Sequence, residues 1–146
     1  MFSRFREPTN SRPGNLFIAV YDIGAGIQTT LRDQLQGCAE RFAQLGDDIK
    51  ELLSLGDGRK LQQVLLKHAI EHQRTSTGLA FRGHGLPEMR DFVLQTATGR
   101  LYIISGGAQY SCSPAQNVSH CITCAPAFPG TLILWDLPFR AKELAP

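Results

Sequence analysis

The stretch Val20-Tyr21-Asp22-Ile23-Gly24-Ala25-Gly26-Ile27 decides how the rest of this chain is interpreted. It overlaps the end of the first apolar run, Leu16 to Tyr21, which is short, contains β-branched and aromatic residues, and follows a segment rich in turn residues (9–15). That pattern predicts a buried strand ending just before Asp22. Phe2 to Arg6 precedes the same turn, so we expect it to form the other arm of a hairpin.

Segments downstream of this stretch show apolar residues at helical spacing. Leu31, Leu35 and Cys38 are separated by four and three residues, which places them on one side of a helix. Pro87 suits the first turn of another helix, where a missing N–H costs nothing. The helices expected on these grounds span Thr29–Leu45, Ile49–Leu55, Arg59–His72 and Leu86–Ala97.

The C-terminal half contains the remaining strands. Leu101–Ser105 and Thr131–Leu137 are apolar runs, and Pro138 is expected to close the second. We expect Arg74–Gly85 to be a loop and Gly106–Ala127 to be an irregular excursion. Strands separated by helices predict an α+β fold, a two-layer α/β sandwich with a mixed sheet and helices on one face, formed as a single domain over residues 1–146.

Composition excludes several classes of protein. The chain has 146 residues, 42% hydrophobic and 19% charged, with a net charge of +2 and no run of basic residues, so no nucleic-acid partner is expected. No apolar stretch reaches the roughly 18 to 20 residues that cross a bilayer, and the N-terminus lacks the apolar core of a signal peptide. These features predict a cytoplasmic protein that does not enter a membrane, with its four cysteines present as thiols.

Two glycine-containing segments carry the candidate chemistry. Asp22 follows the first strand directly, and a carboxylate there can accept a hydrogen bond from an exocyclic amine of a purine. Gly24 and Gly26 would let the backbone approach a flat ring closely. Arg82-Gly83-His84-Gly85-Leu86 opens into a helix whose free N–H groups and positive dipole end suit phosphate oxygens, and His84 could reach a phosphate.

In this order the segments resemble the GHKL superfamily, the ATPase fold of DNA gyrase, heat-shock chaperones, histidine kinases and mismatch-repair proteins. Asp22 to Ile27 reproduces its first glycine box, Thr75-Ser76-Thr77 is similar to the element before the ATP lid, and Gly130-Thr131 is similar to its terminal strand. The resemblance implies ATP as the ligand. It places adenine against Asp22, Gly24, Gly26, Ile27 and Thr131, and phosphates and lid at Thr77, Gly83, His84, Gly85 and Leu86.

One family feature is missing from the sequence. Members of the superfamily carry, before the first box, a helix with an acidic general base and a magnesium-binding asparagine. The 21 residues before Asp22 predict a hairpin, and Asn10 and Asn15 flank its turn. Either Met1 lies within a longer domain or a partner supplies the helix. No catalytic or metal residue is therefore assigned, Mg²⁺ has no identifiable ligand, and turnover is in doubt.

Two other interpretations compete with an ATP-binding module. A sheet lacking one helix leaves an edge and an apolar face that a second copy or a partner protein would cover, which predicts an interaction or oligomerisation module without turnover. The other is a zinc protein, in which Cys112, Cys121 and Cys124 would bind the metal with His120. Gln28 also stands where many GHKL proteins have proline.

Overall fold

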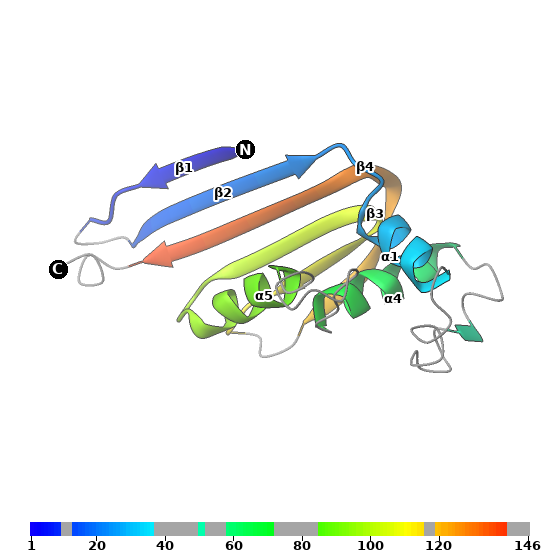
Figure 1. Cartoon of the computed structure of the whole chain (residues 1–146). Coiled ribbons are helices and arrows are strands. Elements are labelled where there is room, and N and C mark those ends of the chain that lie inside the picture. The colour runs from blue at the N-terminus through cyan, green and yellow to red at the C-terminus, as the bar shows by residue number, and fades with distance from the viewer. Residues whose placement is uncertain (10–12, 37–49, 52–57, 72–84, 116–118, 140–146) are drawn as a thin grey trace.

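A computed structural model describes residues 1–9, 13–36, 50–51, 58–71, 85–115 and 119–139 of the chain. Its elements follow in the order β1 (Phe2–Arg6), β2 (Gly14–Asp22), α1 (Ile27–Gln36), α4 (Gly58–Glu71), α5 (Gly85–Gln95), β3 (Arg100–Cys112) and β4 (His120–Phe139). The fold class is α+β, with these helices against a four-stranded sheet (Figure 1). No described helix is long and apolar enough to cross a membrane.

The sheet has the strand order β1-β2-β4-β3, and every described pair of neighbours is antiparallel. The expected mixed sheet is therefore wrong. Strands β2 and β3 do run in the same direction, because each is antiparallel to β4. However, β4 returns from β3 through a hairpin and occupies the place between them, so the parallel pair never becomes adjacent.

The expected hairpin at the N-terminus is confirmed. Strand β1 pairs with β2 from Phe2 opposite Ala19 to Arg6 opposite Asn15. The expected helices over Arg59–His72 and Leu86–Ala97 are found as α4 and α5, with ends shifted by one or two residues. Of the expected helix Thr29–Leu45, the described part is α1, which begins at Ile27. Residues 74–84 of the expected loop and most of the expected helix 49–55 lie outside the described residues, whereas Gly85, expected in the loop, begins α5.

The expectation of an irregular excursion over Gly106–Ala127 is wrong, because Gly106–Cys112 and His120–Ala127 belong to β3 and β4. The ladder shifts register around Gly106, where Gly106 lies opposite Phe128 and Ala108 opposite Thr123. Residues 124–127 and 129–130 of β4 are thus left out of the pairing with β3. Proline is tolerated in such bulges because no ladder hydrogen bond is lost, which explains how Pro126 and Pro129 fit into a strand.

Pro138 does not end β4, contrary to expectation, since the strand continues to Phe139. Strand β3 pairs with β4 only as far as Asp136, whose partner is Arg100. Beyond Asp136, the one neighbour of β4 among the described strands is β2, where Pro138 lies opposite Asn15. A proline without an N–H is therefore acceptable at this point of the strand.

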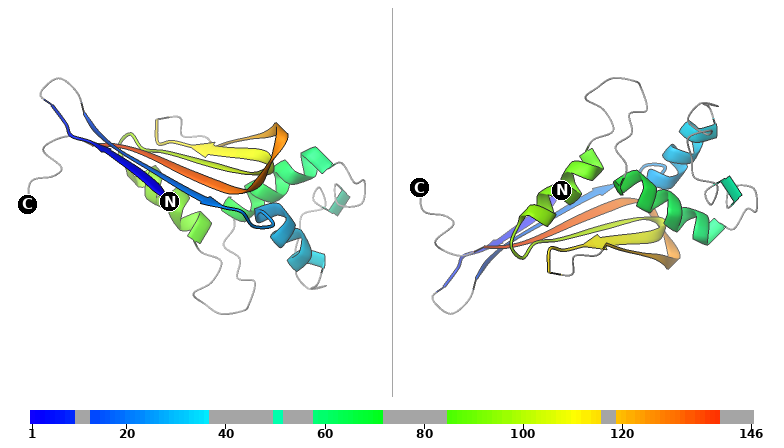
Figure 2. Two further views of the ribbon diagram at one scale, coloured as in Figure 1. Left: turned by 90° about the horizontal axis from the view of Figure 1, so that it is seen from above. Right: turned by 90° about the horizontal axis from the view of Figure 1, so that it is seen from below.

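Most of the core lies between β3 and the helices α4 and α5 (Figure 2). Strand β3 bends at Gly106 and Gly107, so that both of its halves line this core (Figure 1). A smaller cluster joins α1 to α4 through Leu31, Leu61 and Leu65. The main cluster is formed by residues that are almost fully buried: Leu66, Ile70, Val93, Leu101, Ile103, Ala108, Tyr110 and Cys112.

Candidate functional site at the end of the sheet

A row of polar side chains crosses the sheet where β2 ends. Thr131 on β4 is paired with Asp22 on β2 and with Ser105 on β3. Directly opposite residues in an antiparallel ladder point to the same face, so Asp22, Thr131 and Ser105 share one face. That face carries the helices, because Leu101 and Ile103 alternate with Tyr102 on β3 and are fully buried. On this face, the apolar residues of the sheet are therefore followed by a polar row at the end of the sheet where β2 stops.

Ser105 is the centre of a hydrogen-bond network, although it is fully buried. Its Oγ accepts a bond from the Ile27 N–H at 3.0 Å and donates one to the Gly130 carbonyl at 3.1 Å. The Thr131 hydroxyl lies 3.2 Å from the same oxygen. A serine has one hydroxyl hydrogen, so with that hydrogen on Gly130 the Thr131 hydroxyl must be the donor to Ser105. The lone pairs of the Thr131 oxygen then remain available.

Three glycines shape the backbone around this row. Gly26 and Gly130 adopt φ values of 83° and 86°, which side-chain-bearing residues rarely adopt. A Cβ on Gly130 would overlap the Asp22 carbonyl oxygen, and one on Gly24 would lie 2.5 Å from Asp22 Oδ2. The loop can therefore pass directly beside the Asp22 carboxylate, which is itself exposed.

Glutamines from two helices hold the strand that carries Ser105. Gln28, only 5% exposed, donates from Nε2 to the Ser105 carbonyl at 2.5 Å. Gln62 on α4 accepts a hydrogen bond from the Gly107 N–H. A proline in place of Gln28 could not donate this bond, so the residue that departs from the GHKL pattern has a defined structural role here.

The second glycine segment lies partly within the described residues. Gly85 begins α5 and is exposed, with open space where a Cβ would be, while Leu86 packs against the same core as Ile27. Thr77, Gly83 and His84 lie outside the described residues.

The direction of α5 places its first residues near the polar row. The helix leads into the start of β3 and packs on that strand, running back along it (Figure 1). Its 11 residues span about 16 Å at 1.5 Å per residue. The strand from Arg100 to Ser105 spans about 17 Å at 3.4 Å per residue. The start of α5 is thus level with Ser105, and the N–H groups of its first turn lie at the same end of the molecule as Asp22.

The three described cysteines do not form the zinc site considered above. The Cys121 thiol donates to the Gln63 carbonyl at 3.3 Å, whereas the Cys124 thiol donates to the Gly106 carbonyl at 3.8 Å. Burial raises the pKa of Cys121 to about 11 and also raises the pKa of Cys112, so both are thiols in this structure. Within the part of the chain that the structure describes, no group of three metal-ligating side chains comes together.

The site thus brings together five of the sequence-predicted residues. Gly26, Ile27 and Thr131 lie around the Ser105 hydroxyl, Asp22 is in register with Thr131, and Gly24 lies beside the Asp22 carboxylate. Sequence reasoning missed Ser105 as the group that joins them. The available signal was a serine that ends an apolar strand immediately before Gly106-Gly107. Comparison of the chain with protein-family models, curated proteins and solved structures found no match.

Proposed function

We propose that the chain is an ATP-binding module of the GHKL type, with adenine at the Asp22 end of the sheet and phosphates at the start of α5. The observation that carries the proposal is the row of Asp22, Thr131 and Ser105 on one face. The exocyclic amine of adenine has two hydrogens. The Asp22 carboxylate and the Thr131 hydroxyl oxygen, which donates to Ser105 and keeps its lone pairs, supply two acceptors side by side.

The phosphate half of the proposal is supported by the placement of α5. Free N–H groups at a helix start, together with the positive end of the helix dipole, favour bound phosphates. Gly85 is exposed, and among the described residues beyond its chain neighbours no atom lies within 4 Å of the place that a Cβ would take, which leaves room for a ligand beside it. The proposal covers binding and not turnover, and Mg²⁺ would accompany the triphosphate without an assigned protein ligand.

A titration with ATP, followed by calorimetry or with a fluorescent ATP analogue, tests this function. Asp22→Asn should weaken binding by about tenfold or more, because a hydrogen bond to a charged acceptor contributes about 1.5–3 kcal/mol. Asp33→Asn, at an exposed position on α1, is the matched control and should bind as the wild type does. The proposal would be contradicted if the wild-type protein had no measurable affinity for ATP, or if both variants lost the same amount of ATP affinity.

A second candidate function, an interaction or oligomerisation module, is favoured by a separate observation. On the helix side of the sheet, α4 packs on β3 and β4 and α5 packs on β3, whereas Leu16, Ile18 and Val20 of β2 are only partly buried. Beside α5 this side forms an open hollow of about 390 Å³. Its lining is largely apolar and consists of Phe5, Leu16, Phe92, Thr96, Ala97, Leu137, Pro138 and Phe139.

A further inference from the structure

Strand β1 forms one edge of the sheet and is exposed along its whole length. All five of its residues, Phe2 to Arg6, are exposed, and β2 is its one neighbour among the described strands. The outer side of such a strand presents N–H and C=O groups that are ready to pair with another extended chain. Its side chains alternate between the two faces, with Arg4 and Arg6 on one and Phe5 on the other.

The face that carries Arg4 and Arg6 is the one turned away from the helices, and it is rich in positive charge. Arg4 lies in a row with Phe17, Asp136 and Arg100 across the four strands. Asp136 accepts a hydrogen bond of 2.5 Å from Asn15 Nδ2.

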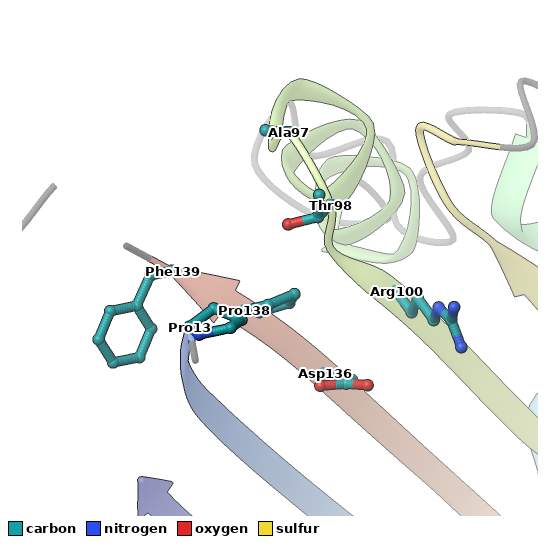
Figure 3. A pocket seen from close by; sticks show the side chains of 7 residues that line it. All are labelled: Pro13, Ala97, Thr98, Arg100, Asp136, Pro138 and Phe139. Carbon is teal, nitrogen blue, oxygen red and sulfur yellow. The ribbon is translucent and has the colours of Figure 1, made fainter. Parts of the chain in front are cut away.

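Arg100 and Asp136 both line an open hollow of about 570 Å³ at this end of the sheet. Figure 3 shows the Arg100 side chain extended along β3, away from that carboxylate. Within the described residues, neither Arg4 nor Arg6 forms an ion pair. These two arginines also line a hollow of about 410 Å³ with Phe2, Asn15 and Phe17.

On the opposite face of β1, Phe5 lies beside other aromatic side chains. Phe5 stacks on Phe139 with 5.4 Å between the ring centroids, and both line the apolar hollow beside α5. Phe92 on α5 also lines that hollow and is 54% exposed, while Phe5 is 56% exposed. A chain added to the edge of β1 would therefore meet arginines on one side and phenylalanines on the other.

We propose that β1 is the docking strand for an acidic, extended segment of a partner protein, which adds to the sheet as a fifth strand. Carboxylates at alternate positions of that segment pair with Arg4 and Arg6, and a large apolar residue between them enters the hollow beside Phe5 and Phe92. Main-chain hydrogen bonds supply affinity, and the alternating side chains supply specificity, as in other cases of strand addition.

A second copy of this chain fits the edge less well. Two β1 strands related by a two-fold axis and overlapping along all five residues would place Arg4 directly opposite Arg4 of the other copy. Like charges in directly opposite positions destabilise a strand pair. Single-stranded nucleic acid would engage the arginines, but it would use neither the main-chain edge nor Phe5 on the other face. An acidic peptide uses all of these features.

This surface is distinct from the proposed nucleotide site. Arg4 is paired with Phe17, which precedes Asp22 on β2 by five residues, a separation of about 17 Å along the strand. The proposal rests on the β1 edge and holds whether or not ATP binds at Asp22.

Selection from a phage-displayed library of random linear octapeptides tests the docking strand. The enriched sequences should carry Asp or Glu at two positions separated by one residue, with an aromatic or large aliphatic residue between them. Selection on the Arg4→Glu/Arg6→Glu variant should enrich Lys or Arg at those positions instead. Arg32→Glu/Arg59→Glu, which makes the same charge change at exposed positions on α1 and α4, should leave the acidic preference intact.

A synthetic version of the best peptide then tests the mode of binding. Methylation of its amide nitrogens at one alternate set of residues should abolish binding, and methylation at the other set should have little effect, because only alternate amides of an added strand face β1. Charge reversal at Arg4 and Arg6 should weaken the peptide on the order of tenfold. Circular dichroism checks that each variant retains its fold.

Several outcomes would overturn the proposal. These are a selection without acidic residues at alternate positions, an equal effect of the two methylated sets, or an unchanged affinity after charge reversal. Binding of a labelled oligothymidine that is lost on charge reversal, with no peptide selected, would assign the surface to nucleic acid instead.

Discussion

Ser105 shows how one buried hydroxyl can organise a site made from three distant segments. It reaches the N–H of Ile27, the carbonyl of Gly130 and the hydroxyl of Thr131, which come from the start of α1 and from β4. A buried polar group is tolerated when its hydrogen bonds are made, and here they are made to two backbone groups and to the Thr131 hydroxyl. The residue thus fixes the loop after Asp22 against the sheet.

Replacement of Ser105 by alanine should lower the free energy of unfolding by about 1–3 kcal/mol, because the buried Gly130 carbonyl and the partly buried Ile27 N–H would both lose a partner. Urea denaturation measures this change. Ser111→Ala is the control on the same strand, since the Ser111 side chain makes no hydrogen bond to the described residues, and it should have little effect. Under the ATP proposal, Ser105→Ala should also weaken nucleotide binding. If the two variants were equally stable, the hydrogen bonds of Ser105 would not be what holds these segments together.

At the scale of elements, the approach of β4 to the end of β2 depends on Gly130. Its φ of 86° and the position of the Asp22 carbonyl both exclude a side chain. Pairing between Asp22 and Thr131 follows immediately after it. The glycine therefore allows the bulge that places Thr131 in the polar row.

Gly130→Ala should destabilise the protein by at least about 1–2 kcal/mol, the cost of a left-handed residue alone, and the overlap with Asp22 should add to this. Gly58→Ala at the first residue of α4 is the matched control, because a Cβ there meets none of the described residues within 4 Å. That variant should be as stable as the wild type or slightly more stable. Thermal unfolding of both variants measures the difference, and a harmless Gly130→Ala would show that the bulge can relax.

At the scale of the whole molecule, the helices cover the β3–β4 half of the sheet and leave apolar side chains of the β1–β2 half only partly buried. The β1–β2 half carries Leu16 and Ile18 on the helix side, and the hollow beside Phe5 and Phe92 opens there. Exposed apolar surface of this kind is typical of interaction sites. The interaction or oligomerisation module would use this uncovered half to bind another chain, whereas the ATP-binding proposal places its ligand at the Asp22 end of the sheet.

Sedimentation velocity with and without an ATP analogue separates these functions. We expect a monomer in both conditions, because full overlap of two β1 edges opposes arginines, and we expect the monomer to bind the nucleotide. A stable dimer that is indifferent to nucleotide would instead support the interaction or oligomerisation module. Phe92→Ser, at an exposed position in the hollow, should dissociate such a dimer if the hollow forms its interface.

The sequence by itself determined the local elements of this protein. Apolar spacing of three and four predicted α4, and the turn before Leu16 predicted the hairpin of β1 and β2, because helix periodicity and turn chemistry depend on residues close together in the chain. The sequence also predicted that Asp22 lies at the end of a strand. That Asp22 binds ATP stays a prediction, which is based on the two glycine-containing segments.

Only the tertiary structure decided which strands are neighbours and what meets at Asp22. The position of β4 between β2 and β3, which makes the sheet antiparallel, results from pairing between residues more than a hundred positions apart. The strand character of Gly106–Cys112 and His120–Ala127 likewise overrides glycines and prolines that locally favour turns. Ser105 joined the site for the same reason, because its partners are distant in sequence and close only after the sheet has formed.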